Sequence, residues 1–506
     1  WRCDMMLSVV LISLGLFLLG AQFLNLQWRS RGFPPGPTPF PIIGSLWRIN
    51  FRADHESLKK LAKIYGNVCT LWLGHTLVVV LYGFQAVKNG LTTNSEDVSG
   101  KLQTYIFNRL ANGKGILVSN GLVWKHQRHF GVGVLQKLGM GNKGMECGIQ
   151  TEARFLVEFF RSKEGIAVDP SFPIVHAVSN VICAVVFGHR FPLEDEIFRQ
   201  LIEASSCMLA FANSYYYYIC EVFQWVAEFL PGPQQKASSS CEFVRSFVRQ
   251  EIKTHREKGK IDEPEDFIDL YLDQIEKTKN IPNSTYDEDN MVQSVFDLFL
   301  GGAETTATTL RWALLYMVAY PDVQEKVQKE LDAVLSPSHL ICYEDWKRLP
   351  YTNAVIHEIL RFGSIILITI PRQVLKDTTL LGYRLPKGTL ITANIDSTLF
   401  DPESWETPHR FNPGHFLDKD GNFVTRQAFL AFSADLCGHC SFPSPSARHR
   451  VCLGKVLAKM ELSIIFCSLL QTFKFTAPEG VKEVNTDVIF GGTMKPHPYK
   501  LCAVPR

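Results

Sequence analysis

The sequence predicts a mainly α-helical protein with a small β region and one N-terminal helix that spans a membrane. Three observations lead to this fold class. Most long segments carry apolar residues at helical spacing, only short runs are rich in β-branched residues, and an uncharged apolar run lies near the N-terminus. The 506 residues show no long flexible linker beyond residue 40, so one large domain behind the anchor is the simplest organisation.

The apolar run extends from Leu7 to Trp28 without a charged side chain. As a helix it measures about 33 Å, enough to cross the hydrocarbon core of a bilayer. A cleaved signal peptide is the competing interpretation, but its apolar region usually has about 7 to 15 residues and ends at a clear cleavage site. Arg29 and Arg31 follow the run, so the positive-inside rule places the rest of the chain in the cytosol.

The next segment, residues 29–38, contains Pro34-Pro35-Gly36-Pro37. Proline holds φ fixed, so we expect a stiff tether. The chain then divides into an anchor at residues 1–28, this tether, and a large domain at residues 39–506.

Composition excludes some classes of protein. Lys and Arg total 52 against 50 Asp and Glu, without a block of like charge, so we expect no nucleic-acid partner. The 13 cysteines are odd in number and scattered, which fits reduced thiols in a cytosol-facing domain better than a disulfide framework.

Helical periodicity dominates the large domain, and strands are confined to two regions. Residues 68–81 are two β-rich runs around Gly74-His75 and predict a hairpin, while residues 363–400 contain short strand-like pieces between turns. The segments with helical periodicity are residues 55–65, 84–92, 121–137, 150–162, 172–186, 193–212, 236–258, 290–318, 322–334, 350–361 and 453–471.

One cysteine lies at the start of the last predicted helix, in Arg450-Val451-Cys452-Leu453-Gly454. The partial positive charge of a helix N-terminus and the Arg450 guanidinium both favour an ionised sulfur, and Gly454 lets a flat group approach. These features predict a metal ligand. The alternative is a small buried hydrophobic residue, as most free cysteines are.

The predicted helix at residues 290–318 is interrupted by Gly301-Gly302, at a cost of about 1 kcal/mol each relative to alanine. Such a cost suggests that something flat approaches the helix. Glu304 and Thr305 then place an acid and a hydroxyl just past the gap, where a threonine Oγ can bond to the carbonyl four residues earlier. An ordinary buried helix is the alternative.

These segments occur together with three others: Trp124-Lys125-His126-Gln127-Arg128, Glu358-Ile359-Leu360-Arg361 and Pro408-His409-Arg410-Phe411. In this order and at these separations the chain resembles the cytochrome P450 haem-thiolate monooxygenases over essentially its whole length. The likeness is strongest to the microsomal family 2 and its arachidonate-epoxygenase branch, through the stretches LRWALLYM, YTNAVIHE and LCAVP.

The resemblance implies the cytochrome P450 fold, with residues 39–506 as its catalytic domain, and haem b as cofactor. Cys452 would be the axial iron ligand, with Gly302 and Gly454 beside the cofactor. Thr305 would provide the hydroxyl at the oxygen-activating turn, and Glu304 would feed protons for O–O cleavage. The haem propionates would be bound by Trp124, Arg128, Arg372 and Arg450.

The resemblance also implies a structural role for Glu358 and Arg361, with Arg410 or His415 as third member of their group. By itself the i,i+3 spacing is that of a surface pair worth only about 0.2–0.5 kcal/mol. An apolar substrate site is expected from the segments that flank the haem in family members. Its candidate lining residues are Ile116, Phe296, Phe299, Ala303, Ile365, Ile366, Leu367 and Phe490.

The implied activity is insertion of one O2-derived oxygen into apolar substrates, with electrons from NADPH through NADPH–cytochrome P450 reductase and cytochrome b5 as a further candidate partner. Epoxidation and hydroxylation of arachidonic and linoleic acids, beside xenobiotic oxidation, is the expected chemistry. The anchor would lie in the lipid of the endoplasmic reticulum membrane. An aromatic stretch at residues 215–229 would dip into the same membrane as a lid.

The chain departs from the family in the loop before the cysteine, where residues 435–448 stand in place of one glycine. The insert contains Cys437-Gly438-His439-Cys440, but Pro443 and Pro445 prevent the helix that a redox-active pair requires. A zinc site that adds His449 is equally disfavoured, since adjacent His439 and Cys440 reach one ion with difficulty. The alternative function is therefore a catalytically impaired, P450-like membrane protein, from a splice variant or an erroneous gene model.

Overall fold

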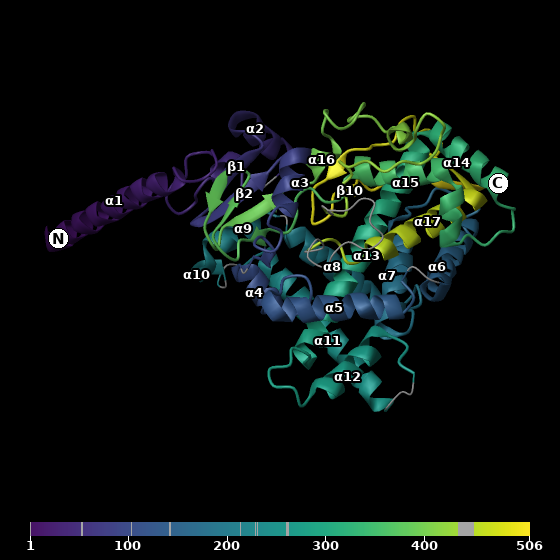
Figure 1. The fold of residues 1–506 in the computed structure, drawn as a ribbon, viewed down its shortest axis with the longest axis horizontal. Coiled ribbons are helices and arrows are strands. Elements are labelled where there is room, and N and C mark those ends of the chain that lie inside the picture. The colour runs from purple at the N-terminus through teal and green to yellow at the C-terminus, as the bar shows by residue number, and fades with distance from the viewer. Residues whose placement is uncertain are drawn as a thin grey trace.

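The computed structural model describes residues 2–51, 54–102, 104–140, 143–212, 214–227, 229, 231–259, 263–433 and 450–506. Helices form most of it, as the sequence predicts, and α13 runs through the centre (Figure 1). Short 3-10 helices are η1 (Leu46–Ile49), η2 (Tyr343–Arg348) and η3 (Pro413–Phe416). The α-helices are α1 (Arg2–Ser30), α2 (His55–Tyr65), α3 (Phe84–Thr92), α4 (Tyr105–Ala111), α5 (Gly121–Lys137), α6 (Lys143–Arg161), α7 (Ser171–Phe187), α8 (Glu196–Ala212), α9 (Tyr215–Val222), α10 (Gln224–Ala227), α11 (Pro233–Glu257), α12 (Phe267–Thr278), α13 (Glu288–Ala319), α14 (Pro321–Val334), α15 (Pro350–Gly363), α16 (Asp396–Leu399) and α17 (Lys455–Thr472).

The strands form one five-stranded sheet, in the order β1-β2-β7-β4-β3, and three two-stranded pairs. The predicted hairpin is present: β1 pairs antiparallel with β2, from Val68 opposite Leu81 to Leu73 opposite Thr76. The strands are β1 (Val68–Leu73), β2 (Thr76–Leu81), β3 (Gly100–Lys101), β4 (Arg372–Gln373), β5 (Thr378–Leu380), β6 (Tyr383–Leu385), β7 (Leu390–Ala393), β8 (Phe473–Thr476), β9 (Val488–Ile489), β10 (Lys495–Pro496) and β11 (Cys502–Pro505).

The main hydrophobic core surrounds α13, whose side chains are buried over most of its length. Helices α7, α15 and α17 pack against it, and so does β10. An apolar helix buried on nearly all sides can only lie in the middle of a large domain. This central position brings α13 next to the segment that carries Cys452, at the start of α17.

The N-terminal helix α1 extends away from the body of the protein (Figure 1). Its residues 4–30 have a mean hydropathy of 2.3 in their most apolar window, none of which is buried, so the helix is long and apolar enough to cross a membrane. Its end is attached to the sheet: Leu26 is buried with Trp72 and Leu77, and Gln22 contacts the ring of His75.

The proline-rich segment is not a free spacer. The carbonyl of Pro35 accepts a hydrogen bond from the Thr70 amide of β1 (2.9 Å), and a Cβ on Gly36 would lie 2.1 Å from the Thr70 carbonyl oxygen. Only glycine permits so close an approach. The segment therefore fastens the anchor to the edge of the sheet.

The aromatic stretch divides into a buried and an exposed part. Tyr217 and Tyr218 of α9 belong to the core beneath β1 and β2, whereas Trp225 and Phe229 are 77% and 82% exposed. Val222 lies against Gly74 at the turn between β1 and β2, so this region neighbours the base of α1.

Candidate active site

Cys452 lies at the N-terminal end of α17. The carbonyl of Val451, next to it, accepts a hydrogen bond from Nη2 of Arg128 in α5 (2.7 Å). Burial raises the pKa of the Cys452 thiol, while amide hydrogen bonds from Gly454 and Lys455 and the charge of Arg128 act in the opposite direction. The helix terminus thus lowers the pKa of the thiol as expected, but burial raises this pKa by more. Neighbouring protein atoms surround the sulfur, but the residue keeps exposed surface that a ligand can reach.

One side of α13 is open at its glycine pair. Gly301 is exposed, and a Cβ added to it would meet nothing within 4 Å. One turn later, Thr305 Oγ1 donates a hydrogen bond to the Gly301 carbonyl (2.8 Å), the back-bond expected of a threonine here. Gly302 lies against α7 instead, because a Cβ added to it would be 3.0 Å from Cγ1 of Ile182 in that helix. Gly302 thus allows the close contact between α13 and α7, and its place beside a cofactor stays a prediction.

The loop at residues 114–119 joins this side of α13 to the cysteine segment. Oδ2 of Asp297 accepts a hydrogen bond from the Ile116 amide (2.7 Å). The Cδ1 atoms of Ile116 and Leu453 lie 3.2 and 3.7 Å from a Cβ added to Gly131 of α5. Ile116 therefore lies between α13 and the residue that follows Cys452.

Four basic side chains gather beside the cysteine segment: Lys101 from β3, Arg128 from α5, Arg372 from β4, and Arg450. Burial lowers the pKa of Arg450 to about 8, and the charges of Arg128 and Arg372 contribute. Burial also lowers the pKa of Arg372 to about 10. The pKa of Lys101 falls well below its ordinary value because of burial and the three neighbouring guanidinium groups.

Three of these cations, Lys101, Arg372 and Arg450, lack a compensating anion in the part of the chain that the structure describes. There, Lys101, Arg372 and Arg450 form no ion pair with an acidic side chain, and Nη1 of Arg450 has no hydrogen-bond partner. The Arg450 guanidinium lies over the Trp124 ring, 4.1 Å from its centroid. Buried like charges are stable only with a counter-charge, so this cluster fits a ligand that carries carboxylates.

A cysteine at a helix start, an open glycine on the facing helix and a buried cation cluster form one site, and the sequence model described as Cytochrome P450 matches residues 34–503. The chain belongs to the cytochrome P450 family. It is 39% identical to cytochrome P450 2J2 of Homo sapiens over 490 residues, which cover 97% of this chain and 94% of that protein. It is 38% identical to cytochrome P450 2J3 of Rattus norvegicus over 500 residues, covering 99% and 96%.

A third relative, cytochrome P450 2C8 of Homo sapiens, is 36% identical over 498 residues, covering 98% of this chain and 99% of that protein. These relatives confirm the resemblance to the microsomal family 2. Proteins of the family carry haem and receive electrons from NADPH through a reductase. The residues of this P450 fit that cofactor, because the buried, orphaned Nη1 of Arg450 and the cations without an acidic partner, Lys101 and Arg372, suit haem propionates.

Lys101 is the member of the cation cluster that sequence reasoning missed. Its Nζ donates to the carbonyl of Ile370 (2.9 Å), and its amide donates to Oδ1 of Asn120 (2.6 Å). The stretch Val98-Ser99-Gly100-Lys101 shows neither helical nor strand periodicity, and lysines are rarely buried. Only the pairing of β3 with β4 brings Lys101 to Arg372.

The predicted structural group is present and fully buried. Arg361 forms two 2.7 Å hydrogen bonds to Glu358, and neither side chain is exposed. Nδ1 of His415 lies 3.2 Å from Oε2 of Glu358, so His415 is the third member. Arg410 contributes only its carbonyl, which accepts from Nη2 of Arg361 (3.0 Å). The pair is therefore part of the core behind the cysteine segment.

The side chains of Glu304 and Thr305 contact different parts of the protein. The Glu304 carboxylate is 3% exposed and forms an ion pair with Lys495 of β10. Ser206 of α8 donates to its Oε2 (3.1 Å), and Thr493 donates to Oε1 (3.5 Å). The acid thus contacts the β9–β10 hairpin and α8, while the Thr305 hydroxyl bonds along its own helix.

The candidate substrate-lining residues separate into two groups. Phe299 and Ala303 stand two residues from Gly301, about half a helical turn, so they face away from its open side. The Phe296 ring also lies elsewhere, 5.8 Å from the Arg245 guanidinium of α11. All three are buried in the core around α13, and their role in lining a substrate site stays a prediction. The remaining candidates are Ile116, Ile365, Ile366, Leu367 and Phe490.

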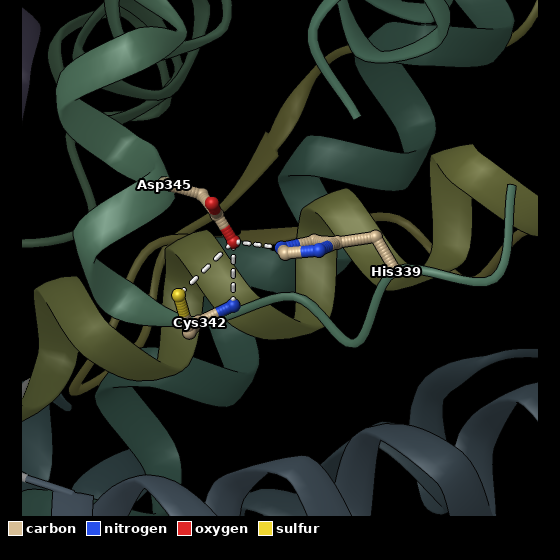
Figure 2. A group of neighbouring side chains, drawn as sticks. All are labelled: His339, Cys342 and Asp345. Carbon is tan, nitrogen blue, oxygen red and sulfur yellow. Dashed lines mark hydrogen bonds and ion pairs between the residues drawn. The ribbon is translucent and has the colours of Figure 1, made fainter. Parts of the chain in front are cut away.

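Away from this site, His339, Cys342 and Asp345 come together at the start of η2 (Figure 2). Oδ2 of Asp345 accepts from the Cys342 amide (2.9 Å) and thiol (3.1 Å) and contacts His339 Nε2 (2.7 Å). Both halves of a capping box are present, so the grouping is explained as a helix cap.

The insertion at residues 435–448 lies outside the described residues, together with His449. Predictions about Cys437, His439 and Cys440 therefore remain predictions.

Proposed function

We propose that this P450 inserts one oxygen atom from O2 into polyunsaturated fatty acids, by epoxidation and hydroxylation, and into apolar xenobiotics. The observation that carries the proposal is the cysteine at the start of α17 beside Lys101, Arg372 and Arg450, which have no acidic partner among the described residues. The similarity to cytochromes P450 2J2 and 2C8 supports this class of reaction.

In this proposal Cys452 holds the iron, and Trp124, Arg128, Arg372, Arg450 and Lys101 hold the propionates. Haem, when bound, supplies oxygen activation and oxygen transfer. Gly301 leaves room for it beside α13, and the Thr305 hydroxyl orients hydrogen bonds on the oxygen side. Glu304 would relay protons to this side.

The substrate would lie between α13 and the loops that carry Ile116, Ile365 and Phe490. The backbone amide of Ile116 is tied to α13 through Asp297, which holds this residue beside the helix. An apolar wall next to Thr305 excludes water from the oxygen side, which favours oxidation of substrate over loss of reducing equivalents.

Microsomal relatives and the apolar helix α1 indicate anchoring in the endoplasmic reticulum membrane. We further propose that the domain faces the cytosol, because Arg29 and Arg31 follow the span. There it would accept electrons from NADPH–cytochrome P450 reductase, with cytochrome b5 as a second donor. Exposed Trp225 and Phe229, near the base of α1, would enter the bilayer surface.

The test is reconstitution of the full chain with haem, reductase and phospholipid vesicles, followed by NADPH, arachidonic acid and isotopically labelled O2. Mass spectrometry should detect epoxides and alcohols with a single labelled oxygen. A Cys452→Ser protein in the same vesicles is the control and should form none. Absence of labelled product from a haem-loaded wild-type protein would contradict the proposal.

A catalytically impaired protein is the second candidate function, and the insertion at residues 435–448 favours it. The family loop shields the thiolate, and added residues there carry an ordering cost. If the wild-type chain takes up haem poorly and a form with one glycine in place of the insertion takes it up fully, the second candidate is correct.

A further inference from the structure

Three side chains that carry metal-binding atoms converge at the start of η2, outside the candidate active site (Figure 2). A ring nitrogen of His339, Sγ of Cys342 and a carboxylate oxygen of Asp345 all lie within 4.8 Å of one another. Nε2 of His339 is 2.7 Å from Oδ2 of Asp345, and Sγ of Cys342 is 3.1 Å from the same oxygen. Imidazole, thiolate and carboxylate are the ligands that zinc takes in proteins.

The helix cap explains only part of this grouping. A cap needs the Asp345 carboxylate at the Cys342 amide, and that hydrogen bond is present at 2.9 Å. It needs no imidazole, yet Nε2 of His339 meets the same carboxylate oxygen. The loop holds His339 in place, because its amide donates to the Ser336 carbonyl (2.9 Å). The cap therefore leaves the position of His339 unexplained.

The distances suit a tetrahedral ion after a small movement. Bonds of about 2.3 Å to sulfur and about 2.0–2.2 Å to nitrogen and oxygen place neighbouring ligand atoms about 3.4–3.6 Å apart. The thiol and the imidazole would therefore move about 0.5–0.7 Å away from Asp345 when an ion takes the place of the shared protons. His339 can make this shift, because its side chain is 34% exposed.

The charges around the three side chains favour a divalent cation. Glu146 of α6 is close enough to act on the Cys342 thiol, and its Oε2 accepts a hydrogen bond from the Tyr343 amide (2.9 Å). Nη1 of Arg348 lies 3.6 Å from Oδ1 of Asp345. With Cys342 deprotonated, these described groups would comprise two carboxylates and a thiolate beside one guanidinium. A divalent ion would balance that excess of negative charge.

A small cavity beside Cys342 and Asp345 adds an independent observation. Asn353 of α15 lines this cavity together with both residues, and so does Cys467 of α17. Asn353 is 6% exposed, and its Oδ1 is buried without a hydrogen-bond partner among the residues that the structure describes. Buried amide oxygens are seldom left unpaired. The cavity has room for about one water molecule, which could donate to this oxygen.

We propose that His339, Cys342 and Asp345 bind a Zn²⁺ ion, with a water molecule between the ion and Asn353 as the fourth ligand. The ion would join the loop before η2 to α15, and the water would satisfy Oδ1 of Asn353. This inference goes beyond the proposed function and does not depend on it, because the site contains no residue assigned to haem, oxygen or substrate.

The first experiment measures zinc in the haem-loaded full chain by elemental analysis, after equilibration with Zn²⁺ and dialysis. Wild type should retain the ion, and Cys342→Ser should lose it, because serine keeps a hydroxyl donor for the cap but provides no thiolate. Cys147→Ser, at an exposed cysteine of α6, is the matched control and should retain zinc as wild type does. Equal zinc content in wild type and Cys342→Ser would overturn the inference.

Two further variants keep the test valid if Cys342→Ser does not fold. The His339 side chain takes no part in the cap, so His339→Gln should fold and bind zinc at least about tenfold more weakly. Asn353→Leu removes the buried acceptor and should weaken binding by about 10–100-fold. Zinc should also raise the Tm of wild type more than that of His339→Gln. Equal zinc affinity of wild type and His339→Gln would contradict the site.

The insertion carries other cysteines and histidines, so the second experiment identifies the ligands. X-ray absorption at the zinc edge, to which haem iron does not contribute, should show one sulfur at about 2.3 Å and nitrogen or oxygen neighbours at about 2.0–2.2 Å. The double variant Cys437→Ser/Cys440→Ser should retain both the zinc and this spectrum. Two sulfur neighbours in wild type, with loss of zinc from the double variant, would place the ion in the insertion and overturn the inference.

Discussion

Replacing Arg361 by methionine should cost most of the stability margin of this P450. Arg361 is fully buried and binds Glu358 through two 2.7 Å hydrogen bonds, and it also donates to the carbonyls of Leu399 (2.7 Å) and Pro408 (2.9 Å). Without it, the buried Glu358 carboxylate keeps, among the described residues, the Asn412 amide and His415 as partners. Breaking one side of a buried ion pair costs about 3–5 kcal/mol. Domains are stable by only about 5–15 kcal/mol.

The chain offers a matched control for this prediction. Glu344 and Lys347 have the same i,i+3 spacing, but their side chains are 71% and 73% exposed. Lys347→Met should change stability by less than about 1 kcal/mol, as exposed pairs contribute little. Urea unfolding of the solubilised, haem-loaded chain, followed by circular dichroism and the haem absorbance, measures both.

The double variant Arg361→Met/Glu358→Gln should recover part of the loss, because it leaves no unpaired buried charge. An unfolding midpoint for Arg361→Met equal to that of Lys347→Met would refute the reasoning. It would mean that burial adds nothing to this pair beyond its helical spacing.

Three further predictions concern the site and its surroundings. Thr305→Ala should keep haem content while diverting electrons to hydrogen peroxide, measured as peroxide per NADPH, and unchanged coupling would remove the role assigned to this hydroxyl. Burial raises the pKa of Glu461 from 4.5 to about 8, so between these pH values the folded state keeps a proton that the unfolded chain releases. The free energy of unfolding should therefore fall as pH rises across this window, by about 5 kcal/mol at most. Glu461→Gln should flatten that fall in Tm, and an identical slope in both proteins would contradict the assignment. Replacing residues 435–448 by one glycine should raise haem per protein and the rate of first-electron transfer from the reductase, whereas equal values would show that the loop tolerates the insertion.

Much of the helical structure could be predicted because its signals are local. The helices at residues 55–65, 84–92 and 121–137 coincide with the periodic segments, and α2 begins where Asp54 accepts a hydrogen bond from the Ser57 amide (2.7 Å). The seven residues of α4 are too few for a periodic pattern, and α12 follows a charged, proline-containing stretch that resembles a loop. Both helices were missed for these reasons.

The site was less predictable, because contacts distant in sequence decide which way each side chain faces. The sequence identifies a glycine pair, but the contact of α7 with Gly302 determines that Gly301 is the open one. The sequence places Glu304 next to Thr305, but the ion pair with Lys495 of β10 turns the Glu304 side chain toward that strand. It leaves Arg410 and His415 as equal candidates, and the path of the chain into η3 selects His415. The sequence shows which residues carry the chemistry, whereas the direction in which their side chains point follows only from the fold.

In the proposed function Cys452 would hold the iron of a haem through its sulfur, and the spectrum of the reduced, CO-bound protein reports on that bond. The wild-type chain should show the red-shifted Soret band of thiolate ligation. Cys452→Ser should lose this band, while Cys437→Ser and Cys440→Ser should keep it. If Cys452→Ser retains the band and Cys437→Ser loses it, the ligand lies in the insertion and the account given for α17 is wrong.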